Sequence, residues 1–360
     1  MSGHTPKKVR IYVDAIGGDT ITGKDGKEQK IEERVVRASL EFLDEHKEAR
    51  IILGGDRKLL EGMVDGSDRI EVVDGRATPY GISAIRRERK GTALYKGLEM
   101  LEAGDCDGLY TSGNTQAVAV YVATTIGRFK GIKSMPLVAR LPKKGEKPVY
   151  LLDVGGGTDN LDVNGFRDLA LLAHAYCKAV AKVDNPRLGL LSIGKEPEKG
   201  GPTITEVDKK LRETRCINYS GLVEPKDWMM KEYEAVISNG FVGNIGIKTI
   251  GGTVILAKSE IKEALNKYPV RKFLAKAILA PAAAMILGPV FYPLKEKYNP
   301  SRANGAALLV PGVFIKGHGE SDVEGIRRGL GAVSEHVNKE VPRRMKEELK
   351  MVREQLTITE

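Results

Sequence analysis

Short apolar runs alternate with longer stretches of helical periodicity over most of the chain, from Val9 to about Leu256. This alternation is typical of βαβ units and predicts an α/β fold with a mostly parallel sheet. Five of the predicted strands run into a polar loop that contains glycine. They are Val9–Asp14, Cys106–Thr111, Val149–Asp153, Arg187–Ile193 and Ala235–Ile237.

Helical periodicity predicts helices at Glu32–Lys47, Ile85–Ala103, Asn114–Arg128, Gly165–Lys182 and Glu206–Arg215. Asp56, Asn164, and either Ser321 or Asp322 are the predicted N-caps. Pro142–Pro148 predicts a turn between two strands, and Gly305–Val310 with Val313–Lys316 predicts a strand pair. The residues after Asp322 predict a charged, solvated helix.

The segment Glu234–Lys248 carries the clearest chemical signal. A strand stops at Ser238-Asn239-Gly240 and a helix begins at once, so free N–H groups and the positive end of the helix dipole meet at one point. Gly243 lets a ligand approach the backbone, Asn244 supplies an amide donor, and Lys248 adds a positive charge one turn later. This predicts an anion site, although an ordinary tight turn would give the same local pattern.

The other strand ends extend this prediction. In an open parallel sheet ligands bind outside the carboxyl ends of the strands, so five such ends predict a single anion-binding crevice. None of the loops has the spacing of a Walker loop or a dinucleotide fingerprint, which argues against a nucleotide enzyme. His318 lies between two glycines, whereas a structural histidine more often sits on a helix or strand face, and a role in ligand binding or loop ordering is about as well supported as a purely structural one. The candidate binding residues are Asp14, Gly17, Gly18, Ser112, Gly113, Asn114, Thr115, Asp153, Gly155, Gly200, Asn239, Gly240, Gly243, Lys248 and His318.

Composition narrows the class of protein. The 360 residues carry a formal net charge of +9, which favours anionic partners. Aromatic residues make up only 6% and no nucleic-acid-binding module is present, so nucleic acid is not an expected partner. Cys106, Cys177 and Cys216 have unrelated spacings that give neither a disulfide framework nor a metal site. With no signal peptide in Met1–Lys8, we expect a cytoplasmic enzyme without a cofactor.

One region differs from the rest. Phe273–Phe291 is apolar, and its uncharged part, Ile278–Phe291, is interrupted by Pro281 and Pro289. It is shorter than the ~20 apolar residues that span a bilayer, and basic residues flank it. We expect a helical hairpin inserted at residues 260–300, either buried in the protein, buried in a dimer, or lying in a membrane interface.

The loops together resemble the phosphate acyltransferase family of bacterial phospholipid synthesis, whose members make acyl-phosphate from acyl-acyl carrier protein and inorganic phosphate. The resemblance implies a doubly wound α/β fold related to isocitrate dehydrogenases and phosphotransacetylases. It also implies one bilobal unit over residues 1–360, a homodimer, and peripheral membrane association through a hairpin that matches Phe273–Phe291. The matching segments are Val13–Asp19, Ser112–Thr115, Gly127–Ile132, Leu151–Gly155, Asn185–Gly194, Asn239–Asn244 and Ile315–Asp322.

The family's proposed catalytic lysine and asparagine fall on Lys199 and Asn244. Both residue types suit the reaction. Phosphate attacks a thioester carbonyl, so a lysine can neutralise the phosphate while an amide N–H stabilises the oxyanion. No serine or cysteine nucleophile is needed.

The chain departs from the family pattern in several loops. The usual Lys-Gly-Asn is Lys199-Gly200-Gly201, and the usual Asp-Gly-Phe-Thr-Gly-Asn is Asn239-Gly-Phe-Val-Gly-Asn244. Gly91 and Thr92 follow a basic run where serine is usual, and Gly155-Gly156-Gly157 replaces a Gly-Ala-Asn stretch. Three alternatives follow: a phosphotransacetylase-like enzyme that uses acyl-coenzyme A, a membrane-docked scaffold with altered catalysis, and, more weakly, a metal-dependent dehydrogenase. The last would use carboxylates near the strand ends, namely Asp14, Asp19, Asp153, Asp159 and Asp162.

Overall fold

The structure is a computed structural model that describes residues 8–23, 26–64, 66–145, 147–156, 161–267 and 305–359. Phe273–Phe291, Gly157 and Asp159 lie outside the described residues.

The central element is an 11-stranded sheet, and a separate two-stranded sheet pairs β2 (Ile21–Thr22) with β3 (Glu28–Gln29). In spatial order the large sheet contains β10 (Asn218–Val223), β9 (Arg187–Leu191), β11 (Ala235–Ile237), β8 (Val149–Leu152), β7 (Leu137–Leu141), β12 (Ala306–Leu308), β13 (Phe314–Lys316), β6 (Gly108–Thr111), β1 (Arg10–Asp14), β4 (Arg50–Gly55) and β5 (Ile70–Asp74).

The sheet consists of two parallel halves that run in opposite directions. β13, β6, β1, β4 and β5 are parallel to one another, and so are β8, β11, β9 and β10. Between the halves, β7 pairs antiparallel with both β8 and β12, and β12 pairs antiparallel with β13. The five strand ends singled out in the sequence therefore do not share one edge. Those of β1 and β6 lie at one edge and those of β8, β9 and β11 at the other, so the basis for a single crevice was wrong.

Alternating side chains on β1 show why helices cover both faces. Ile11 and Val13 enter one core cluster and Tyr12 enters the other, as the two-residue period of a strand requires. In the first half of the sheet one face is covered by α1 (Ile31–Glu45) and α12 (Val323–Asn338), and the other by α4 (Ala93–Ala103) and α5 (Thr115–Thr125). This doubly wound arrangement confirms the predicted fold class.

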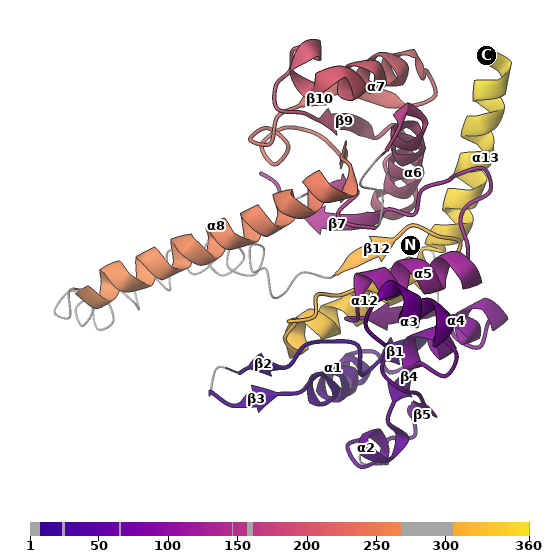
Figure 1. Cartoon of the computed structure of the whole chain (residues 1–360), viewed down its shortest axis with the longest axis vertical. Coiled ribbons are helices and arrows are strands. Elements are labelled where there is room, and N and C mark those ends of the chain that lie inside the picture. The colour runs from indigo at the N-terminus through magenta and orange to yellow at the C-terminus, as the bar shows by residue number, and fades with distance from the viewer. Residues whose placement is uncertain are drawn as a thin grey trace.

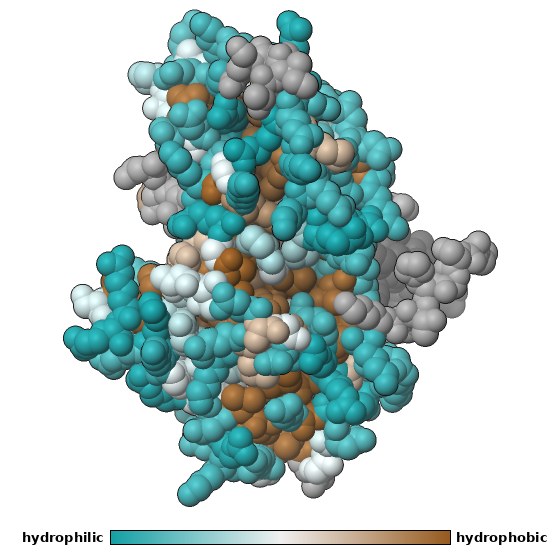
Figure 2. All heavy atoms as spheres, turned by 90° about the vertical axis from the view of Figure 1, so that its right-hand side faces the viewer, coloured by the Kyte–Doolittle hydropathy of each residue, from teal (hydrophilic) through white to brown (hydrophobic). Residues whose placement is uncertain are grey.

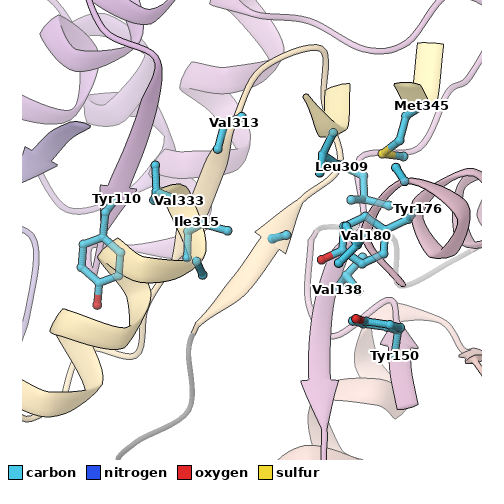
Figure 3. Packing of buried hydrophobic residues seen from close by; sticks show 14 of the residues in the cluster. Tyr110, Val138, Tyr150, Tyr176, Val180, Leu309, Val313, Ile315, Val333 and Met345 are labelled. Atoms are coloured by element: carbon cyan, nitrogen blue, oxygen red, sulfur yellow. The ribbon is translucent and has the colours of Figure 1, made fainter. Parts of the chain in front are cut away.

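Helices also cover the second half of the sheet on the face that includes Tyr150 and Leu188. This face carries α6 (Val163–Ala181), α7 (Gly201–Glu213) and α13 (Val341–Thr359), and α13 runs along α6 (Figure 1). A continuous set of apolar side chains joins the two halves, and Figure 3 shows it passing from Tyr110 and Val333 to Leu309 and Tyr176. The sheet thus spans both lobes of Figure 1, with the antiparallel strands β7 and β12 between them.

One long helix, α8 (Gly240–Lys267), leaves the body of the protein and extends to one side (Figure 1). Its large apolar residues Phe241, Ile245, Ile255 and Leu256 are exposed. Within the part of the chain that the structure describes, Gly240–Ala257 is long and apolar enough to cross a membrane by length and composition alone, and 11% of it is buried. On the opposite flank of the molecule, apolar patches interrupt a mostly hydrophilic surface (Figure 2).

Several element predictions need correction. The segment Ile85–Ala103 is two helices, α3 (Ile82–Arg87) and α4, because Gly91 takes a left-handed φ of 82° and the Thr92 side chain caps α4. The residues after Asp322 form α12 and α13 rather than one solvated helix, and α12 buries a full apolar face that includes Ile326, Leu330, Val333 and Val337.

The predicted caps are mostly correct. Asp56 caps α2 (Arg57–Glu61) and Asp322 caps α12, in each case by accepting a backbone N–H bond. Asn164 is not a cap, since Asp162 accepts the N–H of Gly165 at 2.7 Å and starts α6 two residues earlier than predicted. The predicted strand pair exists as β12 and β13, and the predicted turn at Pro142–Pro148 joins β7 to β8.

Candidate active site

The first turn of α8 is fixed by Asn239. Its side-chain oxygen accepts the N–H of Val242 at 2.8 Å, and its carbonyl accepts the N–H of Gly243 at 3.0 Å. Asn239 therefore acts as the N-cap of the helix that begins at Gly240. The cap leaves Asn244, one position past Gly243, half-buried at the end of the first turn.

Gly243 is required for close packing. A Cβ built there would lie 1.9 Å from the carbonyl oxygen of Asp153, so no larger residue lets α8 approach the loop after β8. The same approach brings Asn244 against Gly155, where a Cβ would be 3.4 Å from the Asn244 amide nitrogen. The structure therefore places the Asn244 amide beside the glycine loop that follows β8.

Asp153 organises that loop. Its side chain is fully buried, and Oδ1 accepts three backbone N–H bonds, from Leu137 at 2.9 Å, Gly155 at 3.0 Å and Gly156 at 2.8 Å. Its own N–H donates to the carbonyl of Ser238 at 2.8 Å, which ties the loop to the end of β11. These bonds give the carboxylate a structural role.

Lys199 lies on a single 3₁₀ turn, η1 (Pro197–Gly200), shortly after β9. Its stem passes over Gly194, where a Cβ would lie 2.5 Å from the Lys199 Cδ atom. Its ammonium group is exposed and pairs with Glu196 at 3.1 Å. Beneath the turn, Gly200 packs against Ser192, whose buried hydroxyl has no hydrogen-bond partner among the described residues.

These three loops follow neighbouring strands. β9 is parallel to β11 and β11 to β8, so the loops with Lys199, Asn244 and Gly155 emerge side by side from one edge of the sheet. We call Lys199, Asn244 and Gly155 with their loops the strand-end site. A cation, an amide donor and a glycine backbone are the groups needed to hold an oxyanion. Lys248, one turn beyond Asn244 on α8, is exposed.

The other candidates gather at the end of β1 and β6. Asp14 is buried, and its Oδ2 accepts the hydroxyl of Thr111 at 2.7 Å. A Cβ at Gly17 would lie 2.3 Å from that oxygen, and the N–H of Gly113 donates to the Thr111 hydroxyl at 2.9 Å. This is a tightly packed loop junction around the carboxyl group. Burial raises the pKa of Asp14 to about 6 and lowers the pKa of Lys316 to about 8.

Most of the remaining candidates also have structural partners. Asn114 caps α5 by accepting the N–H bonds of Gln116 and Ala117. Ser112 hydrogen-bonds to the hydroxyl of Tyr110, and a Cβ at Gly18 would press on Ile31. Thr115 is the exposed first residue of α5.

His318 is exposed, and its Nδ1 accepts the N–H of Glu320 at 3.3 Å. This contact orders the loop between β13 and α12.

Sequence reasoning missed Arg34. This fully buried guanidinium donates to the carbonyls of Asp19 and Ser321, so it links the loop after β1 to the loop before α12. A signal was present, because Arg34 falls on the apolar face of α1 between Ile31, Val35 and Ala38. A charge at such a position indicates a buried polar partner.

Comparison with known proteins decides the family. The sequence matches the family described as "Fatty acid synthesis protein" over residues 9–344. A phosphate acyltransferase of Geobacillus thermodenitrificans is 31% identical over 95% of this chain and 99% of its own. One of Caldanaerobacter subterraneus subsp. tengcongensis is 29% identical over 97% and 100%. The chain belongs to the phosphate acyltransferase family. This confirms the resemblance seen in its loops, and the protein is an enzyme of that family.

Solved structures agree with the fold of this family member. The EutD phosphotransacetylase from Staphylococcus aureus superposes with a TM-score of 0.56 at 14% identity, covering 92% of this chain and 95% of its own. The 4-hydroxythreonine-4-phosphate dehydrogenase from Klebsiella pneumoniae gives a TM-score of 0.54 at 10% identity, covering 92% and 100%. At these identities the similarity shows the fold alone. Among the residues that the structure describes, no group of three His, Cys, Asp or Glu side chains could hold a metal ion.

Proposed function

We propose that this enzyme transfers an acyl group from an acyl-acyl carrier protein to inorganic phosphate at the strand-end site. The observation that carries the proposal is that Lys199, Asn244 and Gly155 follow three adjacent parallel strands whose carboxyl ends lie side by side. The family membership of the chain supports the same chemistry.

In the proposed reaction a phosphate oxygen attacks the thioester carbonyl carbon, the carbon–sulfur bond breaks, and the thiolate leaves with a proton from solvent. Lys199 exchanges Glu196 for phosphate and offsets the repulsion between the anion and the developing oxyanion. The Asn244 amide donates to that oxyanion, and a preorganised donor of this kind is worth ~3–4 kcal/mol in the transition state. The product is an acyl-phosphate.

Removal of either side chain tests the assignment. Lys199→Ala and Asn244→Ala are each expected to reduce phosphate-dependent thiol release at least ~100-fold while leaving the protein folded. Lys209→Ala on the exposed side of α7 is the matched control and should retain wild-type turnover. Near-wild-type turnover in both site variants would refute the catalytic roles.

The same assay separates two of the three alternative functions from the proposed one. A formal charge of +9 favours an acidic carrier protein, so we expect faster turnover with carrier-bound than with coenzyme A-bound acyl groups. The reverse preference would identify a phosphotransacetylase-like enzyme. No phosphate-dependent thiol release from either donor would identify a scaffold.

We also infer a homodimer that acts in the cytoplasm at an anionic membrane surface through Phe273–Phe291, a segment outside the described residues. The exposed apolar side chains of α8 support an interface on this side of the molecule. Ala283→Asp combined with Leu287→Glu is expected to abolish co-sedimentation with anionic vesicles while the dimer mass in light scattering stays unchanged. Loss of the dimer instead would assign the segment to the subunit interface.

A further inference from the structure

A cavity of about 230 Å³ lies on the sheet face that α6 and α12 cover. Tyr150 and Glu234 line it, and these residues stand at the amino ends of β8 and β11. The strand-end site follows the carboxyl ends of the same two strands. The cavity is therefore separate from the candidate active site.

The floor of the cavity is a pair of rows across the sheet. In the first row Val138 of β7 pairs with Ala307 of β12, which is the register neighbour of Ile315 on β13. In the second row Arg140 of β7 pairs with Tyr150 of β8. Because residues two apart on a strand share a face, an apolar row lies directly beside a row with a cation and a hydroxyl.

The two tyrosines that line the cavity differ in their free hydrogen-bonding capacity. The rings of Tyr150 and Tyr176 meet edge to face at 5.2 Å, and Figure 3 shows their hydroxyls on the same side, next to Val138 and Val180. Burial lowers the pKa of His336, so the ring is neutral; Nδ1 donates to the carbonyl of Ala332 at 2.7 Å and Nε2 accepts the Tyr176 hydroxyl at 2.9 Å. The Tyr176 proton is thus committed to His336, whereas the Tyr150 hydroxyl accepts a hydrogen bond from the Arg140 side chain and can still donate its proton.

The charges around the cavity favour an anion. Glu335 is paired with Lys339 at 2.6 Å, and Glu234 accepts the backbone N–H of Arg187 at 2.8 Å. Arg140 and Lys147, both exposed, add two positive charges at the mouth. The volume is below the ~300–1,000 Å³ of sites for drug-sized ligands, so the occupant is small.

We propose that this cavity binds a small organic carboxylate with a ring-sized apolar body. The planar guanidinium of Arg140 can hold the carboxylate through two parallel N–H bonds, and the Tyr150 hydroxyl can donate a third. The apolar body lies on the row of Val138 and Ile315, against the edge of the Tyr176 ring.

Benzoate is a suitable probe, and benzamide is the uncharged control of the same size. Binding of each to the full chain is measured by isothermal titration calorimetry. We expect benzoate to bind at least ~10-fold more tightly than benzamide, because only the anion uses the cationic mouth. Arg140→Gln with Lys147→Gln should remove that preference and leave the two probes equal. Lys209→Gln, a charge change on the exposed side of α7, should leave benzoate binding unchanged.

Filling the cavity gives an independent test. Ala332→Phe is expected to abolish benzoate binding. Ala181→Phe should have the same effect with less risk to folding, because Ala181 is only half-buried at the end of α6. Thermal unfolding confirms that each variant is folded. Any one of three results would overturn the proposal. They are undiminished benzoate binding in a folded variant with a filled cavity, equal affinity of the wild type for benzoate and benzamide, and no benzoate binding to the wild type at millimolar concentration.

Discussion

Replacing Gly243 by alanine tests whether the close packing of α8 controls the strand-end site. A Cβ at Gly243 lies 1.9 Å from the Asp153 carbonyl oxygen, whereas an unstrained contact needs about 3.5 Å. One side must therefore retreat by about 1.5 Å. The loop of Asp153 is held by three N–H bonds to its carboxylate and one backbone bond to Ser238, so we expect the start of α8 to move.

The size of the effect follows from two opposing contributions. Overpacking costs ~1–3 kcal/mol, and replacing a helical glycine by alanine returns up to ~1 kcal/mol. We expect Gly243→Ala to lower the free energy of unfolding by about 1–2 kcal/mol. Asn244 moves with the helix, and a displacement of ~1 Å at a reacting group costs about 100-fold in rate, so phosphate-dependent thiol release should fall by about that factor.

Gly252→Ala is the matched control, because among the residues that the structure describes no atom lies within 4 Å of a Cβ built at this glycine of α8. It should leave turnover unchanged and raise the free energy of unfolding by up to ~1 kcal/mol. Urea unfolding and the thiol-release assay measure both quantities. Wild-type turnover and stability in Gly243→Ala would refute the packing argument, and equal losses in both variants would show a general effect of alanine in α8.

Two further predictions concern the loop junction at β1 and β6. The pKa of Asp14 is about 6 in the folded protein and ~3.9 when unfolded, so the folded state binds more protons between these values and stability falls by about 3 kcal/mol as pH rises through this window. Asp14→Asn should remove that slope from urea unfolding measured at several pH values, and an unchanged slope would assign it to other groups. Arg34→Met removes two buried bonds from a charged donor and should cost about 3 kcal/mol. Hydrogen exchange should then become faster in the loop between β13 and α12, and unchanged exchange there would show that Arg34 does not hold it.

Local sequence signals predicted most of the individual elements well. The strand Ala235–Ile237 has the predicted bounds, since a short apolar run before a polar turn leaves little room for another assignment. The break between α3 and α4, within the single helix predicted at Ile85–Ala103, could have been predicted from the sequence. Gly91-Thr92 combines a residue that ends a helix with one that caps the next, and the apolar period on both sides concealed the break.

The reversal of strand direction was implied by the predicted turn at Pro142–Pro148, and the expectation of a single crevice did not take it into account. β7 and β8 are joined by this short turn and are therefore antiparallel, and that one connection reverses every strand of the second half relative to the first. The burial of α12 was not readable, because it depends on packing across long distances in sequence. On its charged face Glu324 pairs with both Arg327 and Arg328, while its apolar face meets a sheet formed by distant residues.

The sequence also located carboxylates at strand ends without showing what they bind. Asp14 and Asp153 both lie at the end of a strand, and in the folded chain each accepts bonds from its own loop or a neighbouring strand. A polar side chain beside a glycine turn has backbone donors within reach before any ligand arrives. Lys199 and Asn244 differ from these two carboxylates. The Lys199 ammonium group pairs with the Glu196 side chain, and the Asn244 amide lies beside Gly155, so neither group is used in the backbone bonds that shape its loop.

Two of the departures from the family pattern, at positions 239 and 201, have different effects on the backbone. At position 239 asparagine replaces the usual aspartate, and both residues cap helices equally well, so the first turn of α8 keeps its geometry while one negative charge is lost. That loss favours an incoming anion. At position 201 glycine replaces the usual asparagine, and its φ of 78° with ψ of 173° belongs to a region that is essentially restricted to glycine. The backbone after Lys199 therefore follows a path that asparagine would strain, so the glycine at position 201 shapes its loop more strongly than the asparagine at position 239 shapes the first turn of α8.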